Sequence, residues 1–188
     1  MDHYQDIIIF CEPEFPMPVL MNALYSQFHK ALCDLHSTSI GVSFPKYDKT
    51  LGNILRLHGN QIALQGLQNL NWIGGMKGYC VENPILSVPV CTKFRTVYRK
   101  QPTKSQSKLR RLIERRSLTE AQIDQYEASR IANFLDSAYF QLVSGSNGKK
   151  HRRYIVLGKI LDQPVPGEFD RFGLSKTATI PWFSEDLP

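Results

Sequence analysis

Residues 19–35 read VLMNALYSQFHKALCDL, the strongest folding signal in the first half of the chain. The apolar positions in this stretch recur every three or four residues, which is the spacing of one face of an α-helix. These positions are Leu20, Leu24, Phe28, Ala31, Leu32 and Leu35. We therefore predict an amphipathic helix over Val19–Leu35 that buries this face against a core.

Short apolar runs flank this helix and have the length of β-strands. The first run precedes the helix and is followed by Pro13, Pro16 and Pro18. The predicted elements are strands over Tyr4–Phe10, Ile40–Phe44, Ile54–His58 and either Tyr79–Val81 or Leu86–Val90, with a weaker helix over Gln61–Leu70. The resulting order, βαββαβ, predicts an α+β protein whose first domain, residues 1–92, is ferredoxin-like. Because this fold carries many functions, RNA binding among them, it does not by itself assign one.

The most basic part of the chain is residues 93–116, KFRTVYRKQPTKSQSKLRRLIERR, which hold ten Lys and Arg residues and a single acid, Glu114. The whole chain has a net charge of +6, so the remainder is net acidic at −3. On a helix from Thr103 to Arg116, four cations fall within about 60° of one another, with Leu109 and Ile113 opposite. The four are Lys104, Lys108, Arg111 and Arg115. This stripe is either a solvated helix face or a contact surface for a row of phosphates, and the scarcity of acids favours phosphates.

The second half of the chain, residues 93–188, is predicted to form a smaller α+β domain that contains this basic helix. Ser117 and Glu120 have the spacing of a capping box that opens a further helix. The elements that follow are that helix, which extends through Phe134, and strands over Tyr139–Val143, Arg152–Leu157 and near Thr179–Phe183. A polar, Gly-rich loop at 144–150 joins the first two of these strands as a hairpin.

Cysteine usage and the N-terminal sequence favour a cytoplasmic protein. The four cysteines are scattered without a CxxC pair, which fits a reducing compartment better than a zinc site or a disulfide framework. The opening MDHYQDIIIF is acidic and then apolar, unlike a signal peptide. No apolar stretch approaches the ~20 residues of a membrane span. No histidine pair has the spacing of metal ligands, so we predict no metal site. We also predict no other cofactor and no membrane partner.

Several polar and aromatic residues are candidates for chemistry. His29 lies about 120° from the centre of the first helix's apolar face, and it is either an incidental surface histidine or a general acid or base. Ser144 and Ser146 either form the hydrogen bonds of their own turn or donate hydrogen bonds to a phosphate or a ribose hydroxyl. His151, which follows that loop, has a ring that can stack on a base. Phe172 opens the Gly-bearing turn FGLSK, a nonspecific candidate for a phosphate contact.

Taken in order and spacing, these motifs resemble the CRISPR RNA-processing endoribonucleases of type I-F (Csy) systems. The similarity runs nearly end to end, although each piece alone is weak. It rests on MDHYQDI at the start, PEFP at 13–16, His29, IGVSFP at 40–45, RKQ at 99–101, LRRLIERR at 109–116, SGS at 144–146, FGLSK at 172–176 and PWF at 181–183.

The resemblance implies a metal-independent endoribonuclease that binds the repeat stem-loop of a CRISPR transcript and cuts pre-crRNA at the 3′ base of the stem. The ribose 2′-hydroxyl attacks its own phosphate and leaves a 2′,3′-cyclic phosphate and a 5′-hydroxyl. His29 matches the family's general base. Ser144 matches the serine that holds the ribose, with Ser146 able to exchange roles with it. Such an enzyme is expected to stay bound to the cut hairpin, the crRNA, and to join the subunits of the type I-F Csy surveillance complex.

The resemblance also implies a set of RNA contacts. Arg99 and Gln101 match the pair that reads stem bases near the cut, by bidentate hydrogen bonds. Lys108, Arg111 and Arg115, with Arg110 and Arg116 nearby, match the family's arginine-rich helix, and Lys104 of the same basic stripe is a further candidate RNA contact. His151 stands where the family has an aromatic residue that stacks on the terminal base pair. Phe172 replaces a tyrosine of some members, so no phenol is expected to help position the catalytic histidine.

Two rival functions share most of these features. The first is a non-catalytic RNA-hairpin-binding subunit of a ribonucleoprotein complex, which turnover by His29 and Ser144 would distinguish from an enzyme. The second is a basic structural protein such as a ribosomal component. That class would carry cations over several faces, whereas the chain outside residues 93–116 is net acidic.

Overall fold

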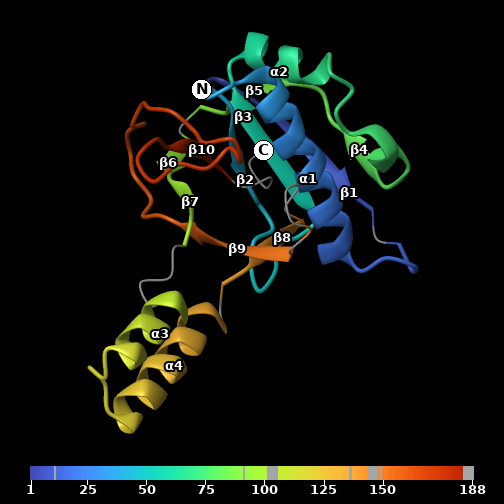
Figure 1. Ribbon diagram of the computed structural model, residues 1–188. Helices are drawn as coiled ribbons and strands as arrows, with labels where there is room; N and C mark the ends of the chain where they lie inside the picture. The colour runs from blue at the N-terminus through green and yellow to red at the C-terminus, as the bar shows by residue number, and fades with distance from the viewer. Residues whose placement is uncertain are drawn as a thin grey trace.

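A mixed α+β architecture is confirmed by the computed structural model, which describes residues 1–10, 12–90, 92–100, 106–135, 137–143, 148 and 150–183. The described strands form a five-stranded, a three-stranded and a two-stranded sheet, and every pairing is antiparallel. Figure 1 shows the first sheet behind a long helix, with a pair of helices projecting from the opposite end of the molecule.

The first sheet is built around β1 (His3–Ile9). Its order is β2 (Gly41–Ser43), β3 (Ile54–Gly59), β1 and β4 (Cys80–Glu82), with β5 (Leu86–Ser87) also paired to β1. The two alternatives for the fourth predicted strand, Tyr79–Val81 and Leu86–Val90, therefore both contain residues of an observed strand, β4 and β5. They pair with different parts of β1, because β4 meets Ile7–Ile9 and β5 meets His3 and Tyr4.

Two helices supply the apolar side of this sheet. α1 (Met17–Leu35) begins two residues before the predicted start, because Pro18 suits the first turn of a helix. α2 (Gln61–Gln68) is capped by Asn60, whose Oδ1 accepts a hydrogen bond from the Ala63 amide at 2.7 Å. The predicted apolar face of α1 is buried, with Leu35 partly so, and it packs in one core with Ile7, Ile9 and Leu57.

The other side of the sheet carries a buried ion pair beneath the end of the described chain. Alternation along β1 places Tyr4 and Asp6 opposite Ile7 and Ile9. Arg56 donates from Nε and Nη2 to the two carboxylate oxygens of Asp6 at 2.7 and 2.8 Å. Its Nη1 donates to the Phe183 carbonyl at 3.1 Å, and its guanidinium lies over the Phe183 ring. The N-terminal sheet and the C-terminal segment are thereby joined.

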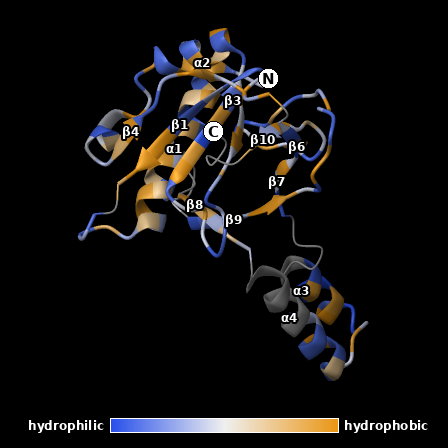
Figure 2. Cartoon of the chain, turned by 180° about the vertical axis from the view of Figure 1, so that it is seen from behind, coloured by the Kyte–Doolittle hydropathy of each residue, from blue (hydrophilic) through white to orange (hydrophobic). Residues whose placement is uncertain are grey.

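The second half of the chain forms the remaining sheets. The three-stranded sheet has the order β7 (Val97–Arg99), β9 (Lys150–Leu157) and β8 (Tyr139–Val143), and β10 (Ile180–Trp182) pairs with β6 (Lys93–Arg95). Between β7 and β8 come α3 (Gln106–Glu114) and α4 (Glu120–Leu135), which lie side by side away from the sheets in both views (Figures 1 and 2).

Three details differ from the sequence predictions. Residues 93–99 form β6 and β7, because they find partners in β10 and β9 that are far away in the sequence. The segment Gly74–Gly78 forms a short 3₁₀ helix, η1, that was not predicted. The capping box of α4 is wrong by two residues: Thr119 and Gln122 exchange the hydrogen bonds, whereas Ser117 Oγ donates to the Leu112 carbonyl at the end of α3.

Candidate active site

His29 lies at the rim of the apolar face of α1, half-buried beside the fully buried Phe28. Its Nδ1 is 2.7 Å from the backbone carbonyl oxygen of Arg171. A carbonyl oxygen only accepts hydrogen bonds, so Nδ1 must carry the proton in this contact. The neutral ring then has a lone pair on Nε2. This nitrogen can accept a proton, as a general base must.

The Phe172 ring holds the imidazole from one side. The two ring centroids are 3.8 Å apart and the planes differ by 15°, so the rings are stacked. Phe172 is also stacked with Phe140 of β8, with centroids 6.4 Å apart and planes that differ by 28°. His29 and Phe172 were both predicted as site residues from the sequence, and the structure places their rings in contact; their roles stay predictions.

The loop that carries Phe172 is fixed by local hydrogen bonds. Asp170 Oδ1 accepts from the amides of Phe172 and Leu174 at 2.8 and 3.0 Å. Gly173 has a φ of 68°, a left-handed conformation that glycine adopts without strain. The buried Tyr25 hydroxyl of α1 donates to the Phe172 carbonyl. The loop and the helix that supplies His29 are therefore anchored to each other.

Arg153 covers the second face of Phe172. Its guanidinium carbon is 3.9 Å from the ring centroid, and the imidazole already occupies the other face at a similar distance. Burial lowers the pKa of Arg153, with a further lowering from nearby Arg99 and an opposing effect of Asp170. The guanidinium is close enough to Phe172 for a cation–π contact. A cation therefore lies on the far side of the ring that stacks on His29.

Arg99 lies close to Arg153 along a groove of about 470 Å³. The groove is lined by residues from β7, β9 and the 168–176 loop, among them Tyr98, Arg99, Arg153, Asp170, Ser175 and Lys176. The register Arg99–Ile155 and Phe140–Arg153 puts these arginines on the same face of the sheet as Phe140. The structure therefore brings His29, Phe172 and Arg99 to one side of the molecule.

The basic helix α3 is separate from this cluster. Leu109 is buried as predicted, but Ile113 is 44% exposed, so the apolar side of α3 is only partly covered by described residues. The cations of α3 and its C-terminal turn are all exposed, and they are Lys108, Arg110, Arg111, Arg115 and Arg116. Because they line a projecting helix, a long polyanion is a better fit for them than a small anion.

The remaining predicted site residues divide into two groups. His151 is exposed near the start of β9, paired with Leu142 of β8. The others lie outside the described residues, and they are Gln101, Lys104, Ser144 and Ser146. Their roles stay predictions.

Sequence reasoning missed Arg153, Asp170 and the Arg171 carbonyl. For Arg153 a signal existed, because alternation along the strand puts it on the same face as His151 and Ile155. Asp170 and the Arg171 carbonyl act through loop backbone geometry, which leaves no residue pattern.

In the described part of the chain, no three or more His, Cys, Asp and Glu side chains gather as a metal site would require. Among those same residues, no helix is both long and apolar enough to cross a bilayer.

A family model and two named relatives match nearly the whole chain. A family model described as CRISPR-associated protein (Cas_Csy4) matches residues 4–183. A protein of Escherichia coli (strain UTI89 / UPEC) named CRISPR-associated endonuclease Cas6/Csy4 is 39% identical over 184 residues, 97% of this chain and 100% of that protein. A protein of the same name from Pseudomonas aeruginosa (strain UCBPP-PA14) is 35% identical over 187 residues, 97% of this chain and 100% of that protein. A solved CRISPR endoribonuclease Cse3 bound to a 19-nt RNA is 14% identical with a TM-score of 0.38, covering 96% of this chain and 100% of that one.

Proposed function

The chain belongs to the Cas_Csy4 family of CRISPR-associated proteins, and from that premise we propose that it is the endoribonuclease that processes pre-crRNA. It binds the stem-loop of the CRISPR repeat and cuts at the 3′ base of the stem. The observation that carries the proposal is the orientation of His29, whose Nδ1–H is committed to the Arg171 carbonyl at 2.7 Å. The proton acceptor that RNA self-cleavage needs is thereby available on Nε2.

The reaction requires no nucleophile from the protein. Nε2 of His29 takes the proton of the ribose 2′-hydroxyl, and the resulting oxygen attacks the adjacent phosphorus. The bond from phosphorus to the 5′-oxygen breaks, and that oxygen leaves as a hydroxyl after taking a proton. The products are a 2′,3′-cyclic phosphate and a 5′-hydroxyl. General-base catalysis of this kind contributes roughly 10²- to 10⁴-fold, and positioning contributes more.

The residues around His29 supply the positioning. Phe172 stacks on the imidazole and limits its rotation, while Ser144 is proposed to hold the ribose in line with the phosphate and Ser146 to support it. Arg153 keeps positive charge one ring away from His29, where it favours the negative charge that grows on the phosphate in the transition state. No metal takes part in this proposal.

RNA recognition is proposed to use the second half of the chain. Arg99 and Gln101 read bases at the open end of the stem, where the groove is accessible, and His151 stacks on the terminal pair. The exposed cations of α3 contact the phosphates of the stem. Residues 1–92 form the ferredoxin-like domain in this proposal, supported by the strand order β2-β3-β1-β4, and residues 93–188 form the hairpin-binding domain. The protein then stays on the crRNA and joins the Csy surveillance complex.

The test is cleavage of the cognate repeat hairpin in EDTA, beside the same RNA with a 2′-deoxy nucleotide at the cut site. We expect the first RNA to be cut and the second to be bound without cleavage. His29→Ala should lower the single-turnover rate by roughly 10²- to 10⁴-fold while hairpin affinity stays close to that of the wild type.

A matched control is His36→Asn, because His36 is exposed at the end of the same helix in a left-handed conformation that asparagine tolerates. It should cleave like the wild type. Tight binding without cleavage of either RNA would instead support the non-catalytic hairpin-binding subunit, and parallel loss of binding and cleavage in His29→Ala would make His29 a folding residue.

A further inference from the structure

The sheet β7–β9–β8 has a second face that the proposed reaction does not use. Alternation along β9 directs Arg153 and Ile155 inward, toward Phe172 and the core, so Lys150, Arg152 and Tyr154 face outward. The register places Tyr139 opposite Tyr154, and Gln141 opposite Arg152. We call these five residues, Tyr139, Gln141, Lys150, Arg152 and Tyr154, the outer face.

Aromatic and guanidinium groups are in contact on the outer face. The rings of Tyr139 and Tyr154 have centroids 5.3 Å apart, and the guanidinium carbon of Arg152 is 4.6 Å from the Tyr139 centroid. Tyr139 is 38% exposed and Arg152 is exposed, so both groups are accessible from solvent. Tyrosine rings and arginine planes are the groups on which nucleobases stack.

The charge of this sheet favours a polyanion. The strands Val97–Arg99, Tyr139–Val143 and Lys150–Leu157 contain no acidic residue. Lys150 and Arg152 are both exposed on the outer face. A nucleic acid supplies both partners that this face can bind, since its phosphates meet the cations and its bases meet the rings.

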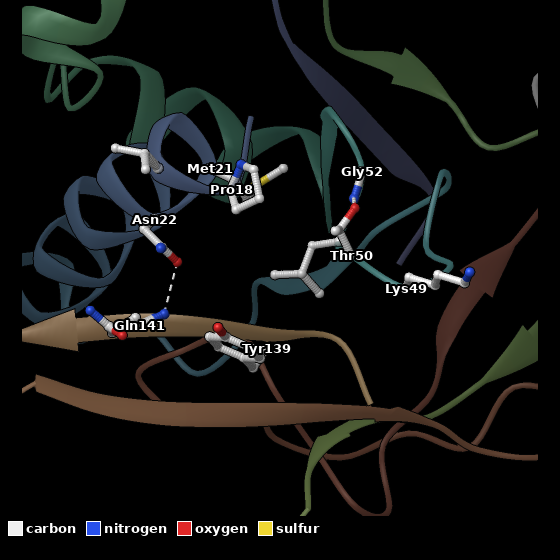
Figure 3. Close-up of a pocket in the computed structure, with 10 residues that line it drawn as sticks. Pro18, Met21, Asn22, Lys49, Thr50, Gly52, Tyr139 and Gln141 are labelled. Atoms are coloured by element: carbon white, nitrogen blue, oxygen red, sulfur yellow. Dashed lines mark hydrogen bonds between the residues drawn. The ribbon is translucent and has the colours of Figure 1, made fainter. Parts of the chain in front are cut away.

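A groove borders the outer face along the edge of β8 that faces away from β9. It has a volume of about 290 Å³ and is lined by residues of α1, β8 and the 49–52 loop, among them Asn22, Lys49, Thr50, Tyr139 and Gln141 (Figure 3). Asn22 Oδ1 accepts a hydrogen bond from the Gln141 amide at 2.7 Å, drawn as the dashed line in Figure 3. The edge of β8 is thus occupied at this residue, which disfavours the addition of a peptide strand from a protein partner.

We infer that the outer face and this groove bind unpaired nucleotides that flank the repeat hairpin. The nucleotides must be unpaired, because bases inside a duplex are stacked on one another and cannot lie on a tyrosine. They must flank the hairpin, because the outer face is on the opposite side of the sheet from Arg153 and the His29 stack. The inference rests on the proposed function only in taking the repeat RNA as the ligand.

The test compares the dissociation constants of a bare repeat hairpin and of the same hairpin with a short unpaired extension at its 5′ or 3′ end. All RNAs carry a 2′-deoxy nucleotide at the cut site, so that binding is measured without cleavage. For the wild type, one extension should tighten binding about tenfold, the effect of one stacked base. The ratio of the two dissociation constants, bare hairpin over extended hairpin, measures this gain. Tyr139→Ala and Arg152→Gln should reduce the ratio toward one, whereas Tyr139→Phe should retain it.

Lys77→Gln is the matched charge control, since Lys77 is an exposed cation on η1 (Gly74–Gly78), outside the three-stranded sheet. Its ratio should equal that of the wild type. The inference is overturned if neither extension changes the wild-type affinity, which would leave the face to a protein partner, or if Lys77→Gln loses the ratio equally. Cleavage of the unmodified hairpin, measured in parallel, reports on the proposed function independently.

Discussion

The buried ion pair between Asp6 and Arg56 is expected to be a large determinant of stability. Both side chains are almost fully buried, with exposed fractions of 7% and 2%. Asp6→Ala would remove both carboxylate acceptors of the Arg56 fork and leave a buried guanidinium packed against the rings of Tyr4 and Phe183. The hydrogen bond from Arg56 to the neutral carbonyl of Phe183 would remain, but it does not balance the charge.

The expected cost is about 3–5 kcal/mol, the usual penalty when one partner of a buried pair is removed and the other charge stays buried. For a chain of this length each kcal/mol corresponds to about 2–4 °C in the melting temperature. The melting temperature of Asp6→Ala should therefore fall by roughly 6–20 °C.

Thermal and urea unfolding followed by circular dichroism would measure this change. The double variant Asp6→Leu/Arg56→Met should be much closer to the wild type, because an apolar pair of similar volume avoids the cost of burying charge. Asp162→Ala, which breaks the exposed Lys93–Asp162 pair, is the control and should change stability little. A loss below about 1 kcal/mol in Asp6→Ala would refute the reasoning.

Three further variants test other parts of the structure. Arg115→Ala should weaken hairpin binding and make the salt dependence shallower by about 0.7–0.9 in the logarithmic slope, and an unchanged slope would exclude Arg115 from the phosphate contacts. Burial, and to a smaller extent nearby Arg56, lowers the pKa of His58 well below 6.5. As the pH falls below 6.5, the unfolded chain is therefore protonated at this histidine before the folded chain is. The contribution of neutral His58 to the free energy of unfolding is complete above pH 6.5 and is lost as the pH falls toward the lower folded-state pKa. His58→Gln should flatten this loss in denaturation midpoints measured between about pH 7 and pH 5, and equal profiles would contradict the assignment. Gly41→Ala places a methyl group 2.6 Å from Ile180 Cγ2 and should cost about 1–3 kcal/mol in urea unfolding, whereas an unchanged midpoint would show that β2 and β10 can move apart.

The predictable parts of the fold are those with local patterns. The helix of Leu24 and Phe28 was found because its apolar spacing is regular and its buried face is continuous. The strands Lys93–Arg95 and Val97–Arg99 were missed because their cations were grouped with the basic stretch of residues 93–116. In the structure Arg95 donates to the Gly158 carbonyl, and its guanidinium lies over the Trp182 ring. Contacts of this kind depend on residues far away in the sequence, so no local pattern predicts them.

The candidate site divides in the same way. His29 was a candidate from its place at the rim of the apolar helix face, and only the family resemblance gave it the role of general base. Its partners could not be found from spacing, since the Arg171 carbonyl is 142 residues away and belongs to the backbone. Arg153 looked like one cation among several, and only the packing of β9 against Phe172 separates it from the exposed Arg152.

The carbonyl that holds the His29 proton has an evolutionary consequence. A side-chain acceptor can be lost by one substitution, but every amino acid at position 171 carries a backbone carbonyl. The Arg171 side chain is exposed, so a saturation library at this position should retain most of its members in a selection for RNA processing. Tolerance should be much lower at Asp170 and Gly173, which set the path of the loop. Natural drift at position 171 therefore need not alter the tautomer of the histidine.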